Sequence, residues 1–171
     1  MIKDKAKILV CEDNVALSGV ICFNLVRAGF EVTSVVNGRL ALDALEKGSF
    51  DLVLSDQQMP MMTGIQLCES MRELPAHRGT PFILLTAKCM EIDFVRLQEK
   101  LGVSKALPKP FSPSELIVCI EEALAVGTRH FLDCILNDKT PLTDGHAGSN
   151  VVRVLEASAI SIKDRGKLVE L

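Results

Sequence analysis

The chain has 171 residues, which is enough for one domain of ordinary size and a short extension. Its formal net charge of −3 provides no basic field, so recruitment of nucleic acid or of an anionic membrane by charge is excluded. Apolar residues make up 48% of the sequence, but Trp and Tyr are absent. The core must therefore consist mainly of Leu, Val, Ile, Ala and Met.

The cysteines and the first residues indicate the compartment. Six cysteines are scattered without a CxxC pair: Cys11, Cys22, Cys68, Cys89, Cys119 and Cys134. Most lie in apolar stretches, which favours buried free thiols in a reducing environment over disulfides or a zinc site. Residues 1–7 are polar and charged, and no signal peptide or membrane-length apolar run follows. We therefore expect a cytoplasmic protein without membrane association.

Short apolar runs alternate five times with segments of helical periodicity. The predicted strands cover residues 7–11, 31–36, 51–55, 81–85 and 104–107. The predicted helices cover residues 14–28, 38–47, 63–74, 90–101 and 113–126. Ser112 stands three residues before Glu115, so the last of these helices is predicted to begin with a capping box.

Strands that alternate with helices predict right-handed βαβ units and a parallel sheet covered on both faces. The runs at 51–55 and 81–85 are largely apolar, as is typical of central strands buried on both sides. Five units predict an α/β fold of the flavodoxin-like doubly wound type, with strand order 2-1-3-4-5. In such sheets, ligands bind beyond the carboxyl ends of the strands.

The pattern changes after residue 126. Residues 128–136 predict a short amphipathic helix, residues 137–149 are rich in turn formers, and residues 151–163 predict a second helix. Residues 168–171 allow a short final strand. We therefore expect two parts, an α/β domain over residues 1–126 and a small helical C-terminal extension over residues 127–171.

Three acidic residues follow two of the predicted strands. Asp56 ends one apolar run, and Glu12 and Asp13 end the first. Taken alone, Glu12 and Asp13 fit a solvated N-cap of the first helix as well as they fit a cation site. Three unpaired carboxylates at one edge would repel one another, so a cation site explains them better than stability does. Mg²⁺ prefers such oxygen ligands, and the backbone carbonyl of Gln58 completes the predicted set of Glu12, Asp13 and Asp56.

Two further polar side chains stand at the ends of the remaining strands. Thr86 ends the fourth apolar run, and Lys109 follows the fifth. Each alone is more often an ordinary surface or capping residue. The Lys109-Pro110 bond can adopt a cis form that would aim the lysine inward. A hydroxyl, an amine and a cation site together can hold phosphoryl oxygens, so the set predicts a metal-assisted phosphoryl site.

The spacing of these residues is similar to that of the receiver domain of two-component response regulators over about residues 5–126. The matching motifs are Glu12-Asp13, Asp56 with Met59-Pro60 and Gly64, Thr86-Ala87, and Lys109-Pro110-Phe111.

The resemblance implies that Asp56 accepts a phosphoryl group from the histidine of a sensor kinase or a phosphotransfer protein. It implies that Glu12 and Asp13 place Mg²⁺, that Thr86 bonds the phosphoryl group and that Lys109 pairs with it. The chemistry would be limited to self-phosphorylation from phosphodonors and autodephosphorylation.

One position departs from the receiver pattern. Receivers usually carry Tyr or Phe three residues before the lysine, and here that position is Ala106. Without an effector domain or a basic patch, we expect output through protein contacts with a partner that the sequence does not name, and no direct binding of nucleic acid. The alternative is an interaction scaffold that works without phosphorylation.

The tail resembles the C-terminal end of Gfo/Idh/MocA-type oxidoreductases. The resemblance is carried by Phe131-Leu132-Asp133-Cys134-Ile135, Pro141-Leu142-Thr143-Asp144-Gly145 and Gly166-x-x-Val169-Glu170-Leu171. Those enzymes need a glycine-rich turn for the dinucleotide, and no GxGxxG occurs in this chain. We therefore favour a structural segment, which allows a homodimer through the tail, over a fragment of an NAD(P)-dependent oxidoreductase.

Overall fold

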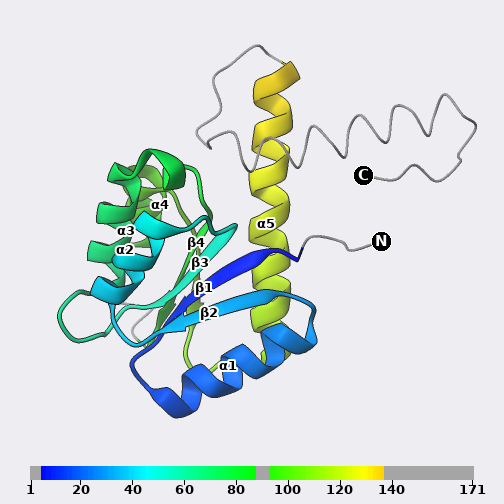
Figure 1. Ribbon diagram of the computed structural model, residues 1–171. Helices are drawn as coiled ribbons and strands as arrows, with labels where there is room; N and C mark the ends of the chain where they lie inside the picture. Colours follow the sequence, from blue (N-terminus) through cyan, green and yellow to red (C-terminus); the bar gives the residue numbers. More distant parts are fainter. Residues whose placement is uncertain (1–4, 88–92, 137–171) are drawn as a thin grey trace, which may run out of the picture.

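The computed structural model describes residues 5–87 and 93–136, which contain one parallel sheet of order β2-β1-β3-β4-β5 (Figure 1). The strands are β1 (Lys7–Cys11), β2 (Glu31–Val35), β3 (Leu52–Asp56), β4 (Phe82–Thr86) and β5 (Val103–Pro108). The helices are α1 (Val15–Arg27), α2 (Gly38–Lys47), α3 (Gly64–Glu73), the 3₁₀ helix η1 (Pro75–His77), α4 (Phe94–Leu101) and α5 (Pro113–Leu136). The predicted flavodoxin-like doubly wound fold is confirmed.

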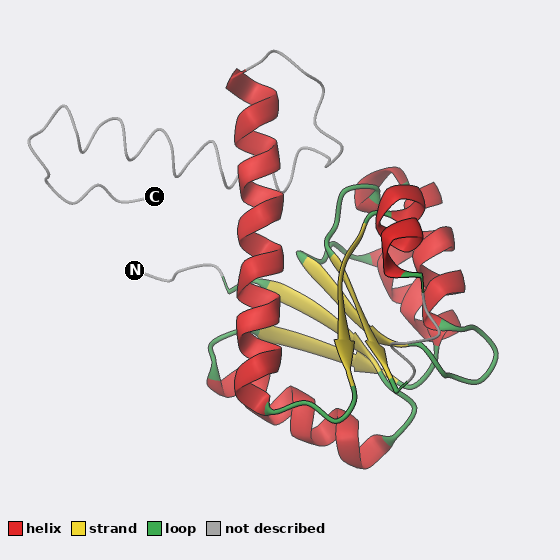
Figure 2. Ribbon diagram, turned by 180° about the vertical axis from the view of Figure 1, so that it is seen from behind, coloured by secondary structure: helices red, strands yellow, loops and turns green. Residues whose placement is uncertain are grey.

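Helices cover both faces of the sheet. The helices α1 and α5 lie on one face and α2, α3 and α4 on the other (Figures 1 and 2). Successive side chains of a strand point to opposite faces. Accordingly, Ile8 and Val10 of β1 join the core beneath α1 and α5, whereas Leu9 and Cys11 join the core on the opposite face. The central strands β3 and β4 are buried along their whole length, as the apolar runs predicted.

The last helix differs from its prediction. The helix α5 runs without interruption from Pro113 to Leu136, so the separate helix expected over residues 128–136 is wrong. An isolated glycine such as Gly127 weakens a helix without having to end it. Figure 2 shows α5 as one long helix that extends past the sheet. The second helix at 151–163 and the strand at 168–171 lie outside the described residues. Within the described parts, no helix is long and apolar enough to span a membrane.

The helix α4 begins later than predicted and is the least buried helix of the fold. It begins at Phe94 rather than near residue 90, because the Asp93 side chain accepts a hydrogen bond from the Arg96 N–H (3.1 Å) and caps the helix there. None of its residues is fully buried. Its contact with the core comes from partly buried Phe94, Leu97 and Leu101. The packing of α4 on the sheet is therefore shallow.

The C-terminal end of α4 is held by Arg72 of α3. Its guanidinium donates to the carbonyl oxygens of Leu101 (2.7 Å), Gly102 (3.0 Å), His77 (2.9 Å) and Thr80 (2.8 Å). Burial lowers the pKa of this guanidinium. Because the last carbonyls of a helix carry partial negative charge, the arginine supplies both hydrogen bonds and a favourable charge at this end.

Candidate functional site

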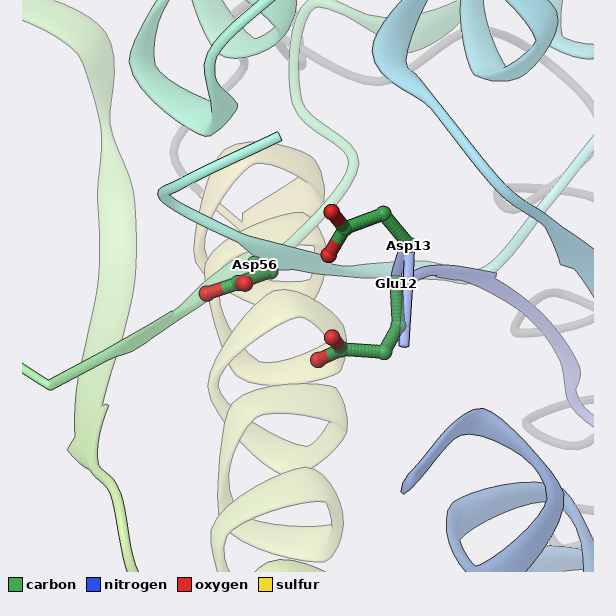
Figure 3. Close-up of side chains that lie close together, drawn as sticks. All are labelled: Glu12, Asp13 and Asp56. Atoms are coloured by element: carbon green, nitrogen blue, oxygen red, sulfur yellow. The ribbon is translucent and has the colours of Figure 1, made fainter. Parts of the chain in front are cut away.

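Three carboxyl groups meet where β1 and β3 end. Glu12 and Asp13 follow β1, Asp56 is the last residue of β3, and the strands are parallel neighbours in the sheet. One ligand oxygen from each of the three lies within 4.8 Å of the others (Figure 3). Glu12 is buried, Asp56 is 7% exposed and Asp13 faces solvent. The structure thus brings together the three acids that the sequence placed at one edge.

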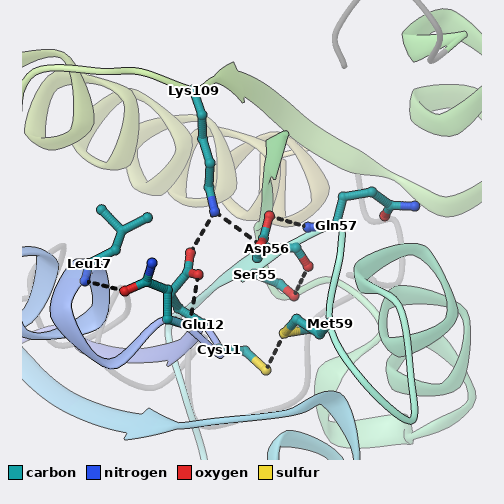
Figure 4. A network of polar contacts seen from close by, with 9 residues as sticks. Cys11, Glu12, Leu17, Ser55, Asp56, Gln57, Met59 and Lys109 are labelled. Atoms are coloured by element: carbon teal, nitrogen blue, oxygen red, sulfur yellow. Dashed lines mark hydrogen bonds and ion pairs between the residues drawn. The ribbon is translucent and has the colours of Figure 1, made fainter. Parts of the chain in front are cut away.

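Lys109 bridges two of these acids. Its Nζ atom lies 2.7 Å from Glu12 Oε2 and 3.0 Å from Asp56 Oδ2 (Figure 4). Burial alone would lower the pKa of Lys109, but the hydrogen bonds to Glu12 and Asp56 raise it above its ordinary value. Lys109 therefore keeps its proton and its positive charge at neutral pH. The peptide bond between Lys109 and Pro110 is cis, the isomer that the sequence left open.

The opposite side of the Asp56 carboxylate is fixed by the backbone. The Gln57 N–H donates to Asp56 Oδ1 (2.8 Å) and also to the Leu85 carbonyl (2.9 Å). The Ser55 hydroxyl donates to the Asp56 carbonyl (2.9 Å; Figure 4). With one oxygen bound by an N–H and the other paired to Lys109, the carboxylate is held from both sides. The sequence did not predict either of the neighbours Ser55 and Gln57.

Thr86 and Gln58 occupy the side of the site that faces α4. Thr86 is the buried last residue of β4, and its carbonyl accepts a hydrogen bond from the Lys109 N–H (2.8 Å). Gln58 is exposed in the loop after β3. Both residues line a cavity of about 680 Å³ between α3 and α4, together with Gln57, Thr63, Ile65, Glu69, Asp93, Arg96, Leu97, Lys100 and Leu101. Thr86 and Lys109 thus adjoin the acids at one end of the sheet, as predicted.

The charge of the cluster determines what it can bind. Burial raises the pKa of Glu12, the charge of Asp56 raises it further, and Lys109 opposes both effects. An ionised Glu12 therefore destabilises the fold unless a positive charge compensates it. Carboxylate oxygens are the donors that hard divalent cations prefer, so the chemistry of Glu12, Asp13 and Asp56 fits a cation such as Mg²⁺.

A buried sulfur contact lies directly beneath the site. The Cys11 thiol donates to the Met59 thioether, with the two sulfur atoms 3.3 Å apart (Figure 4). Burial raises the pKa of Cys11 to about 12, so the thiol stays protonated. This contact links the end of β1 to the loop after β3. Sequence reasoning classed Cys11 only as a small buried apolar residue, and nothing in the local sequence indicates its partner.

Comparison with known proteins gives the family. The model of the response regulator receiver domain family matches residues 8–121. The chain belongs to this family. Sensory transduction protein RegX3 of Mycobacterium tuberculosis is 33% identical over 156 residues, which are 91% of this chain and 63% of that protein. The chain thus spans less than two thirds of the length of this relative.

Two solved structures share the receiver fold and have the same sequence identity to this chain. Chemotaxis protein CheY4 of Vibrio cholerae is 29% identical with a TM-score of 0.66, covering 70% of this chain and 98% of its own. The receiver domain of sensor histidine kinase PA1611 of Pseudomonas aeruginosa is 29% identical with a TM-score of 0.65. The match covers 71% of this chain and 98% of the PA1611 receiver chain. That structure has a magnesium ion coordinated in its active site cleft. The receiver fold and its role in two-component signalling are thereby established for residues 8–121.

The matches to known proteins extend into the tail to different degrees. The family model ends at residue 121. The alignment to RegX3 covers 156 of the 171 residues and so includes residues beyond the end of α5. The resemblance of the tail to Gfo/Idh/MocA-type oxidoreductases finds no support in these comparisons.

Proposed function

We propose that Asp56 is the phosphoryl acceptor of this receiver and that its phosphorylation switches contacts with an output protein. The observation that carries the proposal is the arrangement of Glu12, Asp13 and Asp56 within 4.8 Å of one another, with Lys109 bonded to two of them. This arrangement provides a nucleophile, a cation site and a fixed positive charge at one place.

The proposed reaction follows from the position of each group. One Asp56 carboxylate oxygen attacks phosphorus, the phosphorus–nitrogen bond of a donor phosphohistidine breaks, and the electron pair of that bond leaves with the imidazole. Lys109, freed from part of its ion pair with Asp56, stabilises a phosphoryl oxygen, and the Thr86 hydroxyl bonds another. Glu12, Asp13, Asp56 and the Gln58 carbonyl would hold Mg²⁺, which offsets negative charge on the phosphoryl oxygens. Hydrolysis of the acyl phosphate by water returns the free carboxylate.

Incubation with acetyl phosphate and Mg²⁺ tests the acceptor. Intact-mass spectrometry should show one base-labile phosphoryl adduct on the unaltered chain. Asp56→Asn keeps the size of the side chain and should give none. Asp43→Asn in α2, where the half-buried carboxylate pairs with Arg39, should be phosphorylated like the unaltered chain. Equal yield from Asp56→Asn would refute the assignment. A scaffold that works without phosphorylation is the less favoured alternative, because Glu12, Asp13, Asp56 and Lys109 lie together as a phosphoryl site would require.

The proposal also covers the protein that donates the phosphoryl group and the role of the C-terminal tail. The donor would be a sensor histidine kinase or a phosphotransfer protein, and residues 127–171 would form an extension that allows self-association. We expect the chain to act as no enzyme beyond self-phosphorylation and autodephosphorylation. NAD(P) should not bind, because the sequence has no glycine-rich turn to hold its phosphates. Isothermal calorimetry with NADH and NADPH measures this directly, and micromolar binding would restore the oxidoreductase alternative.

A further inference from the structure

The helix α1 is apolar on its outer side as well as on the side that faces the sheet. It contains a single charged side chain, that of Arg27 at its C-terminal end. Ile21 and Leu25 are buried against the sheet, as expected for a covering helix. Four further apolar side chains of α1 are more than half exposed: Val15, Val20, Phe23 and Val26. Because a helix that is apolar all round is typical of a buried position, the outer side of α1 has the composition of a covered surface.

Three of the exposed side chains form one stripe. At 3.6 residues per turn, Val15, Phe23 and Val26 fall within a sector of about 80° on the side of α1 away from the sheet. We call these three residues the outer stripe. It extends about 17 Å along the helix, and no charged residue stands between its ends in the sequence. Contiguous exposed apolar surface of this kind marks a contact with another segment or chain.

The chain itself contains a segment that matches the outer stripe. Residues 151–163, which lie outside the described residues, predict an amphipathic helix. Its apolar stripe consists of Val151, Leu155, Ala159 and Ile162. The charged residues of the segment fall outside this stripe, which is about 17 Å long, like the outer stripe. A helix this short is only marginally stable in water on its own, so it needs a surface to pack on.

The path of the chain allows the two stripes to meet. The helices α1 and α5 contact each other and lie on the same face of the sheet (Figures 1 and 2). From the buried Ala123 to its end at Leu136, α5 extends about 20 Å. Residues 137–150 span up to about 46 Å when extended. The segment that follows them is therefore long enough in its connection to return to α1.

We propose that residues 151–163 form a helix whose apolar stripe packs on the outer stripe of α1 in the same chain. The tail would then add a layer outside α1 and complete the domain on that face. The driving force would be the apolar surface that both stripes remove from water. The inference does not depend on the acceptor role of Asp56, because the outer stripe contains none of the phosphoryl site residues.

A single tryptophan in the tail of the intact chain tests the packing. Because the chain has no Trp or Tyr, Leu155→Trp reports alone, and its emission should lie at shorter wavelength than in urea. Phe23→Glu then places a charge in the outer stripe. The new carboxylate can pair with Arg27, which already lies over the Phe23 ring (5.8 Å), so α1 stays folded. Phe23→Glu should lower the ratio of docked to free tail about tenfold and shift the emission toward that in urea. Val95→Glu, at a similarly exposed position of α4 on the other face, should leave it unchanged.

Alkylation of Cys22 gives the reciprocal measurement with α1 unaltered. Cys22 is a half-buried free thiol that adjoins the outer stripe on α1. Leu155→Glu should raise its rate of reaction with N-ethylmaleimide about tenfold, in proportion to the loss of docking. Ile160→Glu, on the opposite side of the predicted tail helix, is the matched control and should not.

Three results would overturn the inference. The first is a tryptophan that emits as in urea while α1 is unaltered, and the second is an emission that Phe23→Glu does not change. The third is an equal rate of Cys22 alkylation in the two tail variants. Docking that is lost on dilution would assign the contact to a second copy of the chain and would overturn the intrachain packing as well.

Discussion

At the scale of single residues, Gly64 at the start of α3 packs tightly against β3. A Cβ at this position would lie 2.4 Å from the Asp56 carbonyl oxygen and 2.7 Å from Leu84 Cδ1. Neither a strand carbonyl nor a fully buried leucine can move without shifting the sheet. The close approach therefore requires glycine at position 64.

We predict that Gly64→Ala lowers the free energy of unfolding by about 2 kcal/mol and slows phosphorylation by acetyl phosphate, since Asp56 is displaced. Gly19→Ala is the matched control, because nothing lies within 4 Å of a Cβ there and alanine favours helix α1. The control should be more stable by about 1 kcal/mol and equally reactive. Urea denaturation and intact-mass kinetics measure both quantities. Normal reactivity of Gly64→Ala would show that the Asp56 backbone tolerates displacement.

At the scale of secondary structure elements, the predicted capping box at the start of α5 is confirmed. The Glu115 carboxylate accepts from the Ser112 N–H (2.7 Å), and the Ser112 hydroxyl accepts from the Glu115 N–H (3.2 Å). These bonds lower the pKa of Glu115 below its ordinary value of 4.5. A carboxylate with a lowered pKa stabilises the fold above about pH 4.5, and this contribution is lost as the pH falls below that value.

Replacement of Ser112 tests this capping interaction. Ser112→Ala keeps the backbone N–H and removes only the hydroxyl, so it should raise the pKa of Glu115 part of the way toward its ordinary value, which NMR titration of the Glu115 side chain will show. Loss of an N-cap hydroxyl typically costs about 1 kcal/mol of stability. Glu115→Gln should in turn weaken the dependence of the melting temperature on pH below 4.5. An unchanged Glu115 pKa in Ser112→Ala would mean that the backbone N–H of residue 112 alone lowers it.

The sequence predicted most elements because their signals are local. The apolar runs of β3 and β4 and the bounds of α2 agree with the structure to within a residue. The start of α4 and the continuity of α5 were mispredicted, because a capping aspartate such as Asp93 and a mid-helix glycine have the same local signals as ordinary loops. In the site, the converging strand ends were predictable from topology. The pairing of Lys109 with Glu12 and the contact of Cys11 with Met59 join residues far apart in the chain, so no local pattern indicates them.

At the scale of the whole molecule, we expect the acidic cluster to couple cation binding to folding. Three carboxyl groups held together are compensated only in part by Lys109, and burial opposes the charge of Glu12. A divalent cation that bound only the folded arrangement would stabilise the fold by an amount that grows with its concentration.

We therefore predict that Mg²⁺ raises the melting temperature, with a stabilisation of about 2.7 kcal/mol at a free concentration one hundred times the Kd. Asp13→Ala should abolish this response, and Glu46→Ala on exposed α2 should retain it. Calorimetry at constant ionic strength separates specific binding from screening by salt. A response of the same size in Asp13→Ala would place the cation elsewhere.

The bond between Arg72 and the end of α4 has a mechanical consequence. The guanidinium fixes Leu101 and Gly102, while the body of the helix has no fully buried side chain. A rod that is pinned at one end and lightly held along its length travels farthest at its free end. In α4 the end away from Arg72 is Phe94, which packs only partly on the core and lies on the side of the helix that follows Thr86 in the chain. A shift of α4 would therefore pivot about the contact with Arg72, and the largest displacement would fall at its N-terminal end, where Asp93 and Thr86 line the same cavity.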